Sequence, residues 1–348
     1  MRMTVLASGS KGNSTVVASA RTRVLVDAGL SCRELLRRMA LAGEDPTALD
    51  AILITHEHID HVAGLPVLAR RLNIPVFFTE PTHRAWVRMV TPRTTMTYAQ
   101  WLDHVQREKE TRAAQTAATN PGGPSFPVSP ERVGCLSISA TATETLRSDD
   151  PNPTLELPVD PDEEELCAPS QSREKLNPAS LPAVEYFHSG TNFCIGDLDI
   201  TPFTIPHDAA DPCGFVFHSR SESIRMAIAT DLGYVPPNVK AALKAIDVLL
   251  LESNHDLEML RDGPYPWSVK QRVLSRVGHL SNHATADFLS NDYDGGASYI
   301  VLGHLSESNN VPELARLAAE QALIAHPTLL GNRVLLAHQS APLDPISL

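Results

Sequence analysis

The sequence predicts an α/β protein, because short apolar runs rich in β-branched residues alternate with stretches of helical periodicity. Six of these apolar runs end in polar side chains of types that can bind metals or substrates. Those side chains are Asp27, His56, His207, Asp231, Glu252 with Asn254 and His255, and His304. Functional groups at strand ends, with helices covering the sheets, are typical of α/β folds.

Each predicted element follows from its local pattern. In the first half, we expect strands at RTRVLVD (21–27) and AILIT (51–55), and helices at SCRELLRRMALAG (31–43) and VAGLPVLARRL (62–72). In the second half, we expect strands at DITPFTIPH, IRMAIATD, DVLLLESNHD and SYIVLGH, each of which ends in a polar group. Apolar β-branched runs favour strands, whereas apolar residues three or four positions apart favour amphipathic helices.

Residues 105–182 differ from the sequence on either side. They are rich in Pro, Ser, Thr, Ala and acidic residues, as in DDPNPTLELPVDPDEEEL, and show no sustained period. Such a composition cannot bury enough apolar surface to form a core, so we predict a disordered or loosely ordered insertion. The 348 residues then form one domain, residues 1–348, interrupted by this segment.

Composition argues against several classes of protein. No apolar run approaches the ~20 residues that span a bilayer, and the start MRMTVLASGS lacks a signal-peptide pattern. We therefore expect a cytoplasmic protein without a membrane partner. The five cysteines are scattered without a CxxC motif, which argues against a disulfide framework and against a thiolate zinc site.

The net charge of −12 is unfavourable for a nucleic-acid partner. Residues 143–175 hold ten acidic and three basic side chains, a balance of −7, which leaves −5 for the rest of the chain. Any polyanion would therefore need a local basic patch and the positive charge of bound metal.

A histidine-rich motif, HEHIDH, follows the strand predicted at 51–55. His56 and His58 are two residues apart, so in an extended loop both imidazoles point the same way and can reach one ion. Asp60 and His61 stand where the chain turns into a helix and can face a second ion. The other interpretation is a polar surface loop, but His and Asp side chains at later strand ends are available to complete a metal site.

HEHIDH after an apolar strand resembles the signature of the metallo-β-lactamase fold. The segments ASGSKGNS, LVDAGLSCREL, IPHDAADP, ATDLGYV, LLLESNHD, GHLSN and LGHLSESNN, in this order, resemble the YycJ/WalJ family of bacterial metal-dependent nucleases, relatives of tRNase Z. The resemblance covers residue 3 to about residue 325, without the insertion. It implies a metallo-β-lactamase-like αββα four-layer sandwich, in which two sheets pack together and helices lie outside.

The resemblance also implies a site for two divalent ions, Zn²⁺ first and Mn²⁺ as the alternative. The implied ligands are His56, His58 and His207 for one ion, Asp60, His61 and His304 for the other, and Asp231 as the bridge between them. Two such ions about 3.5–4 Å apart lower the pKa of a shared water and clamp the oxygens of a phosphoryl displacement.

Three further roles follow from the matching motifs. His279, in GHLSN, is implied to be a catalytic residue that stabilises the transition state or protonates the leaving oxygen. A structural histidine that caps a helix is the other interpretation. Asp60 is implied to be catalytic as well as a ligand, and Asp27 to orient a ligand histidine without binding an ion.

The implied function is metal-dependent phosphodiester hydrolysis of nucleic acid, and the family suggests DNA cleaved as a 5′→3′ exonuclease. A small-molecule hydrolase of the same fold, acting on a lactone, a thioester or a cyclic phosphodiester, would share the metal site but have a closed pocket. A regulator with a structural metal is the third class, and the complete set of seven ligand positions argues against it.

Several substrate contacts are expected but have structural alternatives. Asn13, in SGSKGNS, can offer its amide to a phosphate, or the glycines can simply form a tight turn. Asn254 and His255 can line the site or hydrogen-bond to strand ends, and Asn282 is a further candidate. The stretch RDGPYPWSVKQRVLSRVGH can track phosphates through its basic residues and Trp267, or can be a charged face of a surface helix.

Overall fold

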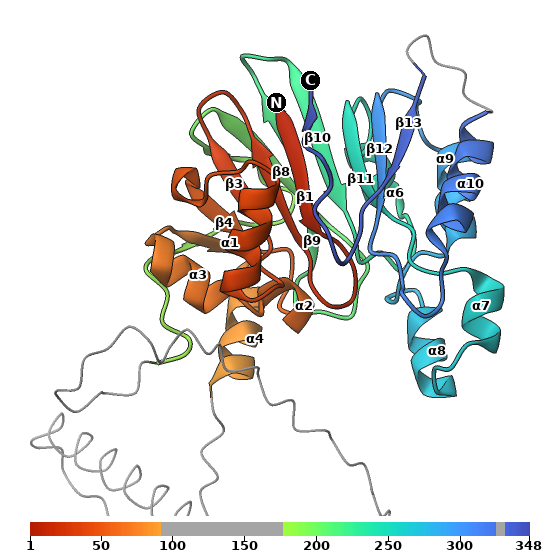
Figure 1. The fold of residues 1–348 in the computed structure, drawn as a ribbon, viewed down its shortest axis with the longest axis horizontal. Coiled ribbons are helices and arrows are strands. Elements are labelled where there is room, and N and C mark those ends of the chain that lie inside the picture. The colour runs from red at the N-terminus through yellow and green to blue at the C-terminus, as the bar shows by residue number, and fades with distance from the viewer. Residues whose placement is uncertain (92–176, 325–330) are drawn as a thin grey trace, which may run out of the picture. The chain divides into compact units, whose positions relative to one another are not determined.

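Two seven-stranded sheets face each other in the computed structural model, which describes residues 1–91, 177–324 and 331–348 (Figure 1). In spatial order, the first sheet consists of β14 (Ile346–Ser347), β1 (Arg2–Ala7), β2 (Ser14–Ala18), β3 (Arg23–Val26), β4 (Ala51–Leu53), β5 (Val76–Phe78) and β6 (Val184–Tyr186). The second consists of β13 (Arg333–Leu336), β12 (Tyr299–Gly303), β11 (Val248–Glu252), β10 (Ile224–Ala229), β9 (Cys213–Ser219), β8 (Leu198–Thr204) and β7 (Phe193–Ile195).

The two sheets have similar connectivity. In the first sheet, β1, β2 and β3 pair antiparallel, and β3, β4, β5 and β6 pair parallel. In the second, β7, β8, β9 and β10 pair antiparallel, and β10, β11, β12 and β13 pair parallel. The parallel strands of each sheet therefore end at one edge, which is the lower edge in Figure 1.

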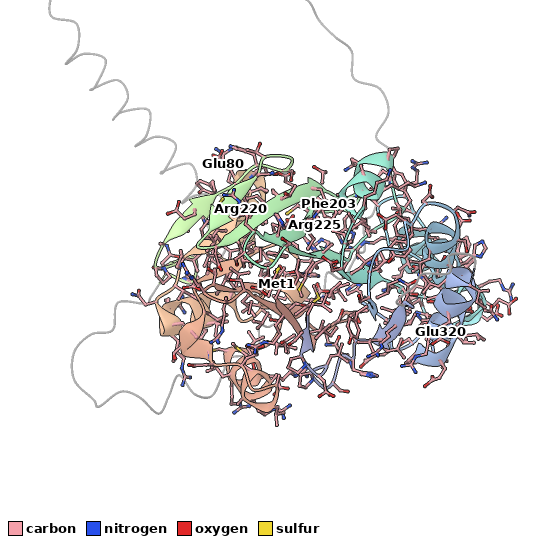
Figure 2. The ribbon with its side chains drawn as sticks, turned by 90° about the horizontal axis from the view of Figure 1, so that it is seen from above. Met1, Glu80, Phe203, Arg220, Arg225 and Glu320 are labelled. Atoms are coloured by element: carbon pink, nitrogen blue, oxygen red, sulfur yellow. The ribbon has the colours of Figure 1, made fainter. Side chains whose placement is uncertain are left out.

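Side chains that alternate along the strands fill the space between the sheets. Along β11, Val248 and Leu250 belong to the apolar cluster between the sheets, whereas Leu249 and Leu251 belong to the cluster on the outer face. Because successive residues of a strand point to opposite faces, one apolar run supplies both clusters. Figure 2 shows the same layers from above, with the buried Met1 inside the molecule and Glu320 on the outside.

Helices cover the outer face of each sheet. The described residues form the helices α1 (Cys32–Leu41), α2 (Ile59–Val62), α3 (Leu65–Leu72), α4 (Glu80–Val90), α6 (Pro237–Ala242), α7 (Leu257–Asp262), α8 (Trp267–Val273), α9 (Asn282–Asn291) and α10 (Pro312–Leu323), with a 3-10 turn at Pro46–Ala48. Of these, α7 and α8 lie at the lower end of the second sheet (Figure 1). Leu35 and Leu68 pack α1 and α3 against the first sheet. Phe288 and Ala315 pack α9 and α10 against the second. Three apolar layers thus separate four layers of secondary structure.

Local sequence signals define where the helices begin. Ser31 caps α1, because its hydroxyl accepts a hydrogen bond from the backbone N–H of Glu34 at 3.3 Å. Ser281 caps α9 in the same way through Ala284 at 3.1 Å. Side-chain oxygens at these positions satisfy N–H groups that have no partner within the helix.

The predicted fold class is confirmed: the described residues form an αββα sandwich, and all six strands predicted to end in polar groups are present. The described residues belong to one unit, Met1–Thr91 with Gln171–Leu348. The predicted insertion, residues 105–182, lies outside the described residues as far as position 176, so its role and the single-domain organisation stay predictions. In the described part of the chain, no helix combines the length and apolar character needed to cross a bilayer.

Candidate metal centre

The candidate site lies where β3, β4, β8, β10, β11 and β12 end, so both sheets contribute to it. Asp27, Asp231 and His304 follow β3, β10 and β12 and adopt left-handed backbone conformations, with φ of 60°, 63° and 55°. Non-glycine residues in this region cost about 1–3 kcal/mol and are concentrated at functional sites. The three sharp turns direct buried polar side chains to the same edge of the sandwich.

The loop that carries HEHIDH is held close to its neighbours by backbone contacts. The backbone N–H of Asn13 donates a hydrogen bond to the carbonyl of Asp60 at 2.7 Å. A Cβ on Gly29 would lie 1.7 Å from the same carbonyl oxygen, so only glycine permits this approach. The loop therefore has a defined position before any ion binds.

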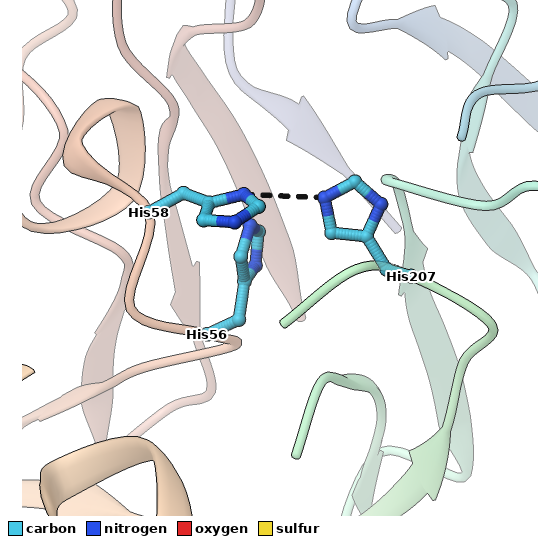
Figure 3. A group of neighbouring side chains, drawn as sticks. All are labelled: His56, His58 and His207. Carbon is cyan, nitrogen blue, oxygen red and sulfur yellow. Dashed lines mark hydrogen bonds between the residues drawn. The ribbon is translucent and has the colours of Figure 1, made fainter. Parts of the chain in front are cut away.

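One donor group consists of His56, His58 and His207, from the loop after β4 and the loop after β8 (Figure 3). One ligand atom from each lies within 4.8 Å of the others. The Nδ1 of His58 is 3.2 Å from the Nε2 of His207. The three rings come from both sheets, so the sandwich has to fold before this group exists.

A second donor group consists of Asp60, His61 and His304. The Oδ2 of Asp60 lies 3.5 Å from the Nε2 of His61 and 3.6 Å from the Nε2 of His304. His61 and His304 are buried, whereas the Asp60 side chain is 18% exposed. The accessible edge of this group is thus a carboxylate.

Asp231 lies between the two groups. Its Oδ2 is 3.4 Å from the Nε2 of His61, and its Oδ1 is 3.5 Å from the Nε2 of His304. It also forms a group of possible ligands with His56 and His61. Both distances are to members of the second group, and the group that Asp231 shares with His56 extends to the first, so this carboxylate has the position that a bridging ligand needs.

The unsatisfied atoms of the site fit divalent ions. The Nε2 of His56, the Oδ2 of Asp231 and the Nε2 of His304 are buried and make no hydrogen bond among the described residues. Buried polar atoms almost always have partners, so three without one in a single site indicate a missing ligand. Imidazole nitrogens and carboxylate oxygens are donors that suit zinc and manganese.

Without ions, protons compensate the charge of the site. Burial opposes protonation of His61, but Asp231, Asp60 and Asp27 outweigh it and raise the pKa of His61 to about 9. Burial also opposes ionisation of Asp231, but His304 and His61 outweigh it and hold its pKa well below its usual range. Burial lowers the pKa of His56. Ions would replace the protons, since a histidine ligand must be neutral.

Asp27 contacts His61. Its Oδ2 lies 2.8 Å from the Nδ1 of His61, while the backbone N–H and the hydroxyl of Thr55 donate to its two oxygens at 2.9 and 2.8 Å. This contact holds the Nδ1 proton on His61 and leaves the Nε2 free to face an ion. That Asp27 orients a ligand histidine stays a prediction.

Glu252 has a role that the sequence did not reveal. It is fully buried at the end of β11, and its Oε1 accepts hydrogen bonds from the Nδ1 of His279 at 2.7 Å and of His304 at 3.0 Å. Its Oε2 accepts from the backbone N–H of Leu232 at 2.6 Å. One carboxylate therefore links a proposed ligand to the proposed catalytic histidine. The available signal was an acidic residue that completes the apolar run VLLLE.

His279 lies beside the donor groups, with its side chain 19% exposed. Its ring centre is 5.2 Å from that of His207 and 5.0 Å from that of His304. It can also form a group of possible ligands with Asp231, Glu252 and His304. Its Nδ1 faces Glu252, and a catalytic role for its Nε2 stays a prediction.

The predicted substrate contacts have protein partners of their own, with one exception. The Asn13 amide lies 3.2 Å from the Oδ2 of Asp60, and the Asn254 amide donates to the carbonyl of His304 at 2.8 Å. Asn282 bonds to Ser253 at 2.7 Å. In contrast, neither ring nitrogen of the buried His255 makes a hydrogen bond within the described residues, and burial lowers its pKa to about 4. Substrate contact by these four residues stays a prediction.

Comparison with known proteins agrees with this fold. Residues 7–129 match the metallo-beta-lactamase superfamily, and residues 160–326 match a beta-lactamase superfamily domain. The metallo-β-lactamase fold protein YhfI of Bacillus subtilis has a TM-score of 0.54 at 12% identity, over 99% of both chains. The protein is therefore a hydrolase of the metallo-β-lactamase superfamily, whose fold implies binding of divalent metal.

Two relatives define the family more narrowly. The exodeoxyribonuclease YycJ of Bacillus anthracis is 30% identical over 323 residues, which are 93% of this chain and 89% of that protein. The exodeoxyribonuclease WalJ of Streptococcus pneumoniae (strain D39) is 29% identical over 91% of this chain and 86% of that protein. The chain belongs to the YycJ/WalJ family.

Proposed function

We propose that the protein hydrolyses phosphodiester bonds of nucleic acid with two divalent ions, Zn²⁺ or Mn²⁺. The observation that carries this proposal is the pair of donor groups on either side of Asp231, with His279 next to them. Ions bound there would lower the pKa of water and neutralise charge on the phosphodiester. The seven residues predicted as ligands all contribute to these groups.

The remaining side chains of the site orient the histidine rings and provide the group that protonates the leaving oxygen. Asp27 and Glu252 fix the Nδ1 protons of His61 and His304, so the Nε2 atoms of both rings face the centre. Glu252 also holds the Nδ1 of His279, which directs its Nε2 toward the substrate. We assign His279 as the group that protonates the leaving oxygen or stabilises the transition state. Its partial exposure allows contact with a large substrate.

We further propose DNA as the substrate and 5′→3′ exonuclease action. Both family members named above are exodeoxyribonucleases, and the identity to them extends over most of each chain. The partly exposed His279 and Asp60 also favour a polymer, since a small-molecule hydrolase needs a closed pocket.

The test uses DNA and RNA strands labelled at the 5′ or the 3′ end, incubated with pure protein and Zn²⁺ or Mn²⁺. We expect mononucleotides to be released from the 5′ end of DNA, and chelation to stop the reaction. Release from the 3′ end, or a preference for RNA, would contradict the finer assignment. No release from any strand, with turnover of a lactone or thioester, would show a small-molecule hydrolase.

A further inference from the structure

The acidic charge of the chain leaves open how a polyanion is held near the metal centre. The basic stretch 261–279 is the sequence candidate, and α8 within it lies at the site's end of the sheets (Figure 1). Two of its cations are engaged elsewhere. The Nζ of Lys270 donates to the carbonyls of Arg261 and Gly263 at 2.7 and 2.8 Å, and Arg261 pairs with Asp262 at 2.9 Å. Lys270 thus ties α8 to the turn before it, and the charge of Arg261 is paired with that of its sequence neighbour.

Arg272 stands at the rim of the metal centre. Its Nε donates to the Oδ2 of Asp208 at 2.5 Å, and the Oδ1 of Asp208 is 3.4 Å from the Nε2 of His207. The hydrogen bond to Asp208 raises the pKa of the guanidinium, and the charge of Asp60 adds to the effect. The Arg272 side chain is 60% exposed, and its two Nη groups make no hydrogen bond within the described residues. Asp208 therefore orients the Arg272 guanidinium and leaves its two Nη groups available to bind another partner.

Arg276 supplies a second cation, close to the turn that carries Asp231. Its guanidinium lies 4.1 Å from the ring centre of Tyr234, three residues after Asp231. A Cβ on Gly233 would lie 2.1 Å from the carbonyl oxygen of Arg276, so this backbone approaches the Asp231 turn closely. In the described part of the chain, Arg276 has no carboxylate partner, and its charge is not neutralised.

The exposed Trp267 belongs to a different face. It starts α8 five positions before Arg272, which separates the two side chains by about 140° around the helix. Trp267 shares its face with Leu274, which is also exposed. Trp267 therefore does not share the face of α8 on which Arg272 contacts Asp208.

We propose that Arg272 and Arg276, one near His207 and the other near the Asp231 turn, bind successive phosphates of a nucleic-acid backbone beside the metal centre. This inference rests on the proposed function and narrows its substrate class. Two guanidiniums at one centre fit a chain with more than one phosphate, whereas a cyclic or isolated phosphodiester offers only one. Planar guanidinium forks suit phosphate oxygens, and cations are needed to offset the acidic chain.

The competing explanation is that Arg272 only ties α8 to the loop after β8. Arg220 provides a matched control, because its Nε donates to the Oδ2 of Asp199 in the same way and its side chain is 74% exposed. It lies in the turn before β10, whereas Asp231 follows the opposite end of that strand. A substitution there removes an equivalent surface ion pair without changing the rim.

The experiment measures equilibrium binding of a short fluorescein-labelled single-stranded oligodeoxynucleotide with phosphorothioate linkages to the metal-loaded protein. Salt is varied from about 50 to about 200 mM. We expect Arg272→Gln and Arg276→Gln each to weaken binding about tenfold at the lowest salt. Each should lower the slope of log K against log salt by about 0.7, the contribution of one phosphate contact on a single strand. Arg220→Gln should bind as the unchanged protein does.

If Arg272→Gln and Arg276→Gln match Arg220→Gln in affinity and in salt slope, the inference is overturned. The same holds if Arg272→Gln lowers the melting temperature and changes neither affinity nor slope. Turnover of bis(p-nitrophenyl) phosphate by the unchanged protein tests the proposed function separately. If the ester is turned over but the salt slope is the same in the arginine variants, the proposed function is supported and the phosphate contacts are rejected. A salt slope that depends on the arginines, without turnover of this ester or of DNA, would support the phosphate contacts and reject the proposed hydrolytic function.

Discussion

Replacing Glu252 by Gln tests whether this buried carboxylate positions the metal centre. Glu252 accepts hydrogen bonds from two histidine N–H groups through one oxygen and from the backbone N–H groups of Leu232 and Leu280 through the other. A Gln side chain has only one carbonyl oxygen. Whichever way its amide is turned, the NH₂ group faces two donors that lose their acceptor.

The magnitude follows from those contacts. Each buried donor without an acceptor costs about 1–3 kcal/mol, so we expect a loss of at least about 2 kcal/mol in the free energy of unfolding. For a domain of this size, the melting temperature should fall by about 4 °C or more. Metal affinity should fall about 10–100-fold, the usual effect of losing the partner of a ligand histidine.

The assay combines elemental analysis after dialysis against graded chelator, thermal unfolding, and kcat on labelled DNA. Glu44→Gln is the matched control, since Glu44 is also buried but bonds to Arg2 and Thr4 away from the site. The control should lose stability and keep metal affinity and kcat. If Glu252→Gln behaves like the control, with lower stability alone, the positioning role is refuted.

Asp231→Ala and His279→Ala should fail differently. Loss of Asp231 should remove metal and stability together, whereas His279→Ala should keep about two ions per chain, an unchanged melting temperature, and kcat reduced by about 10²–10⁴-fold. If elemental analysis finds less metal in His279→Ala, this histidine is a metal ligand. Metal uptake should release protons and tighten as pH rises toward 9, because the metal-free pKa of His61 is about 9. In chelator-treated protein the same group contributes stability that is full below its ordinary pKa of 6.5 and is lost as pH rises through about 9, so a melting temperature that rises over this interval would argue against the pairing. Replacing residues 110–180 by a short Gly/Ser linker should leave a folded, metal-loaded protein, and aggregation or metal loss would show that the segment is structural.

Much of the site could be predicted from the sequence because its groups stand at the ends of strands. The runs before Asp27, His207, Asp231 and His304 have local apolar patterns, and a pattern of this kind shows where a strand stops. HEHIDH adds several donors within one loop. Strand ends of a parallel sheet meet at one edge, so the candidates could be named before their contacts were known.

Only the tertiary structure decided which candidates touch each other. Glu252 and His304 are 52 residues apart, and Arg272 and Asp208 are 64 apart, so no local period relates them. Lys270 and Arg272 stand two positions apart in one basic stretch, yet one is buried against carbonyls and the other is at the rim of the centre. The sequence by itself predicted the six strands that end in polar groups, two of the helices and the proposed metal donors, because these depend on neighbours along the chain. The pairing of those donors depends on how two sheets from opposite halves of the chain pack, and that packing is a property of the folded molecule alone.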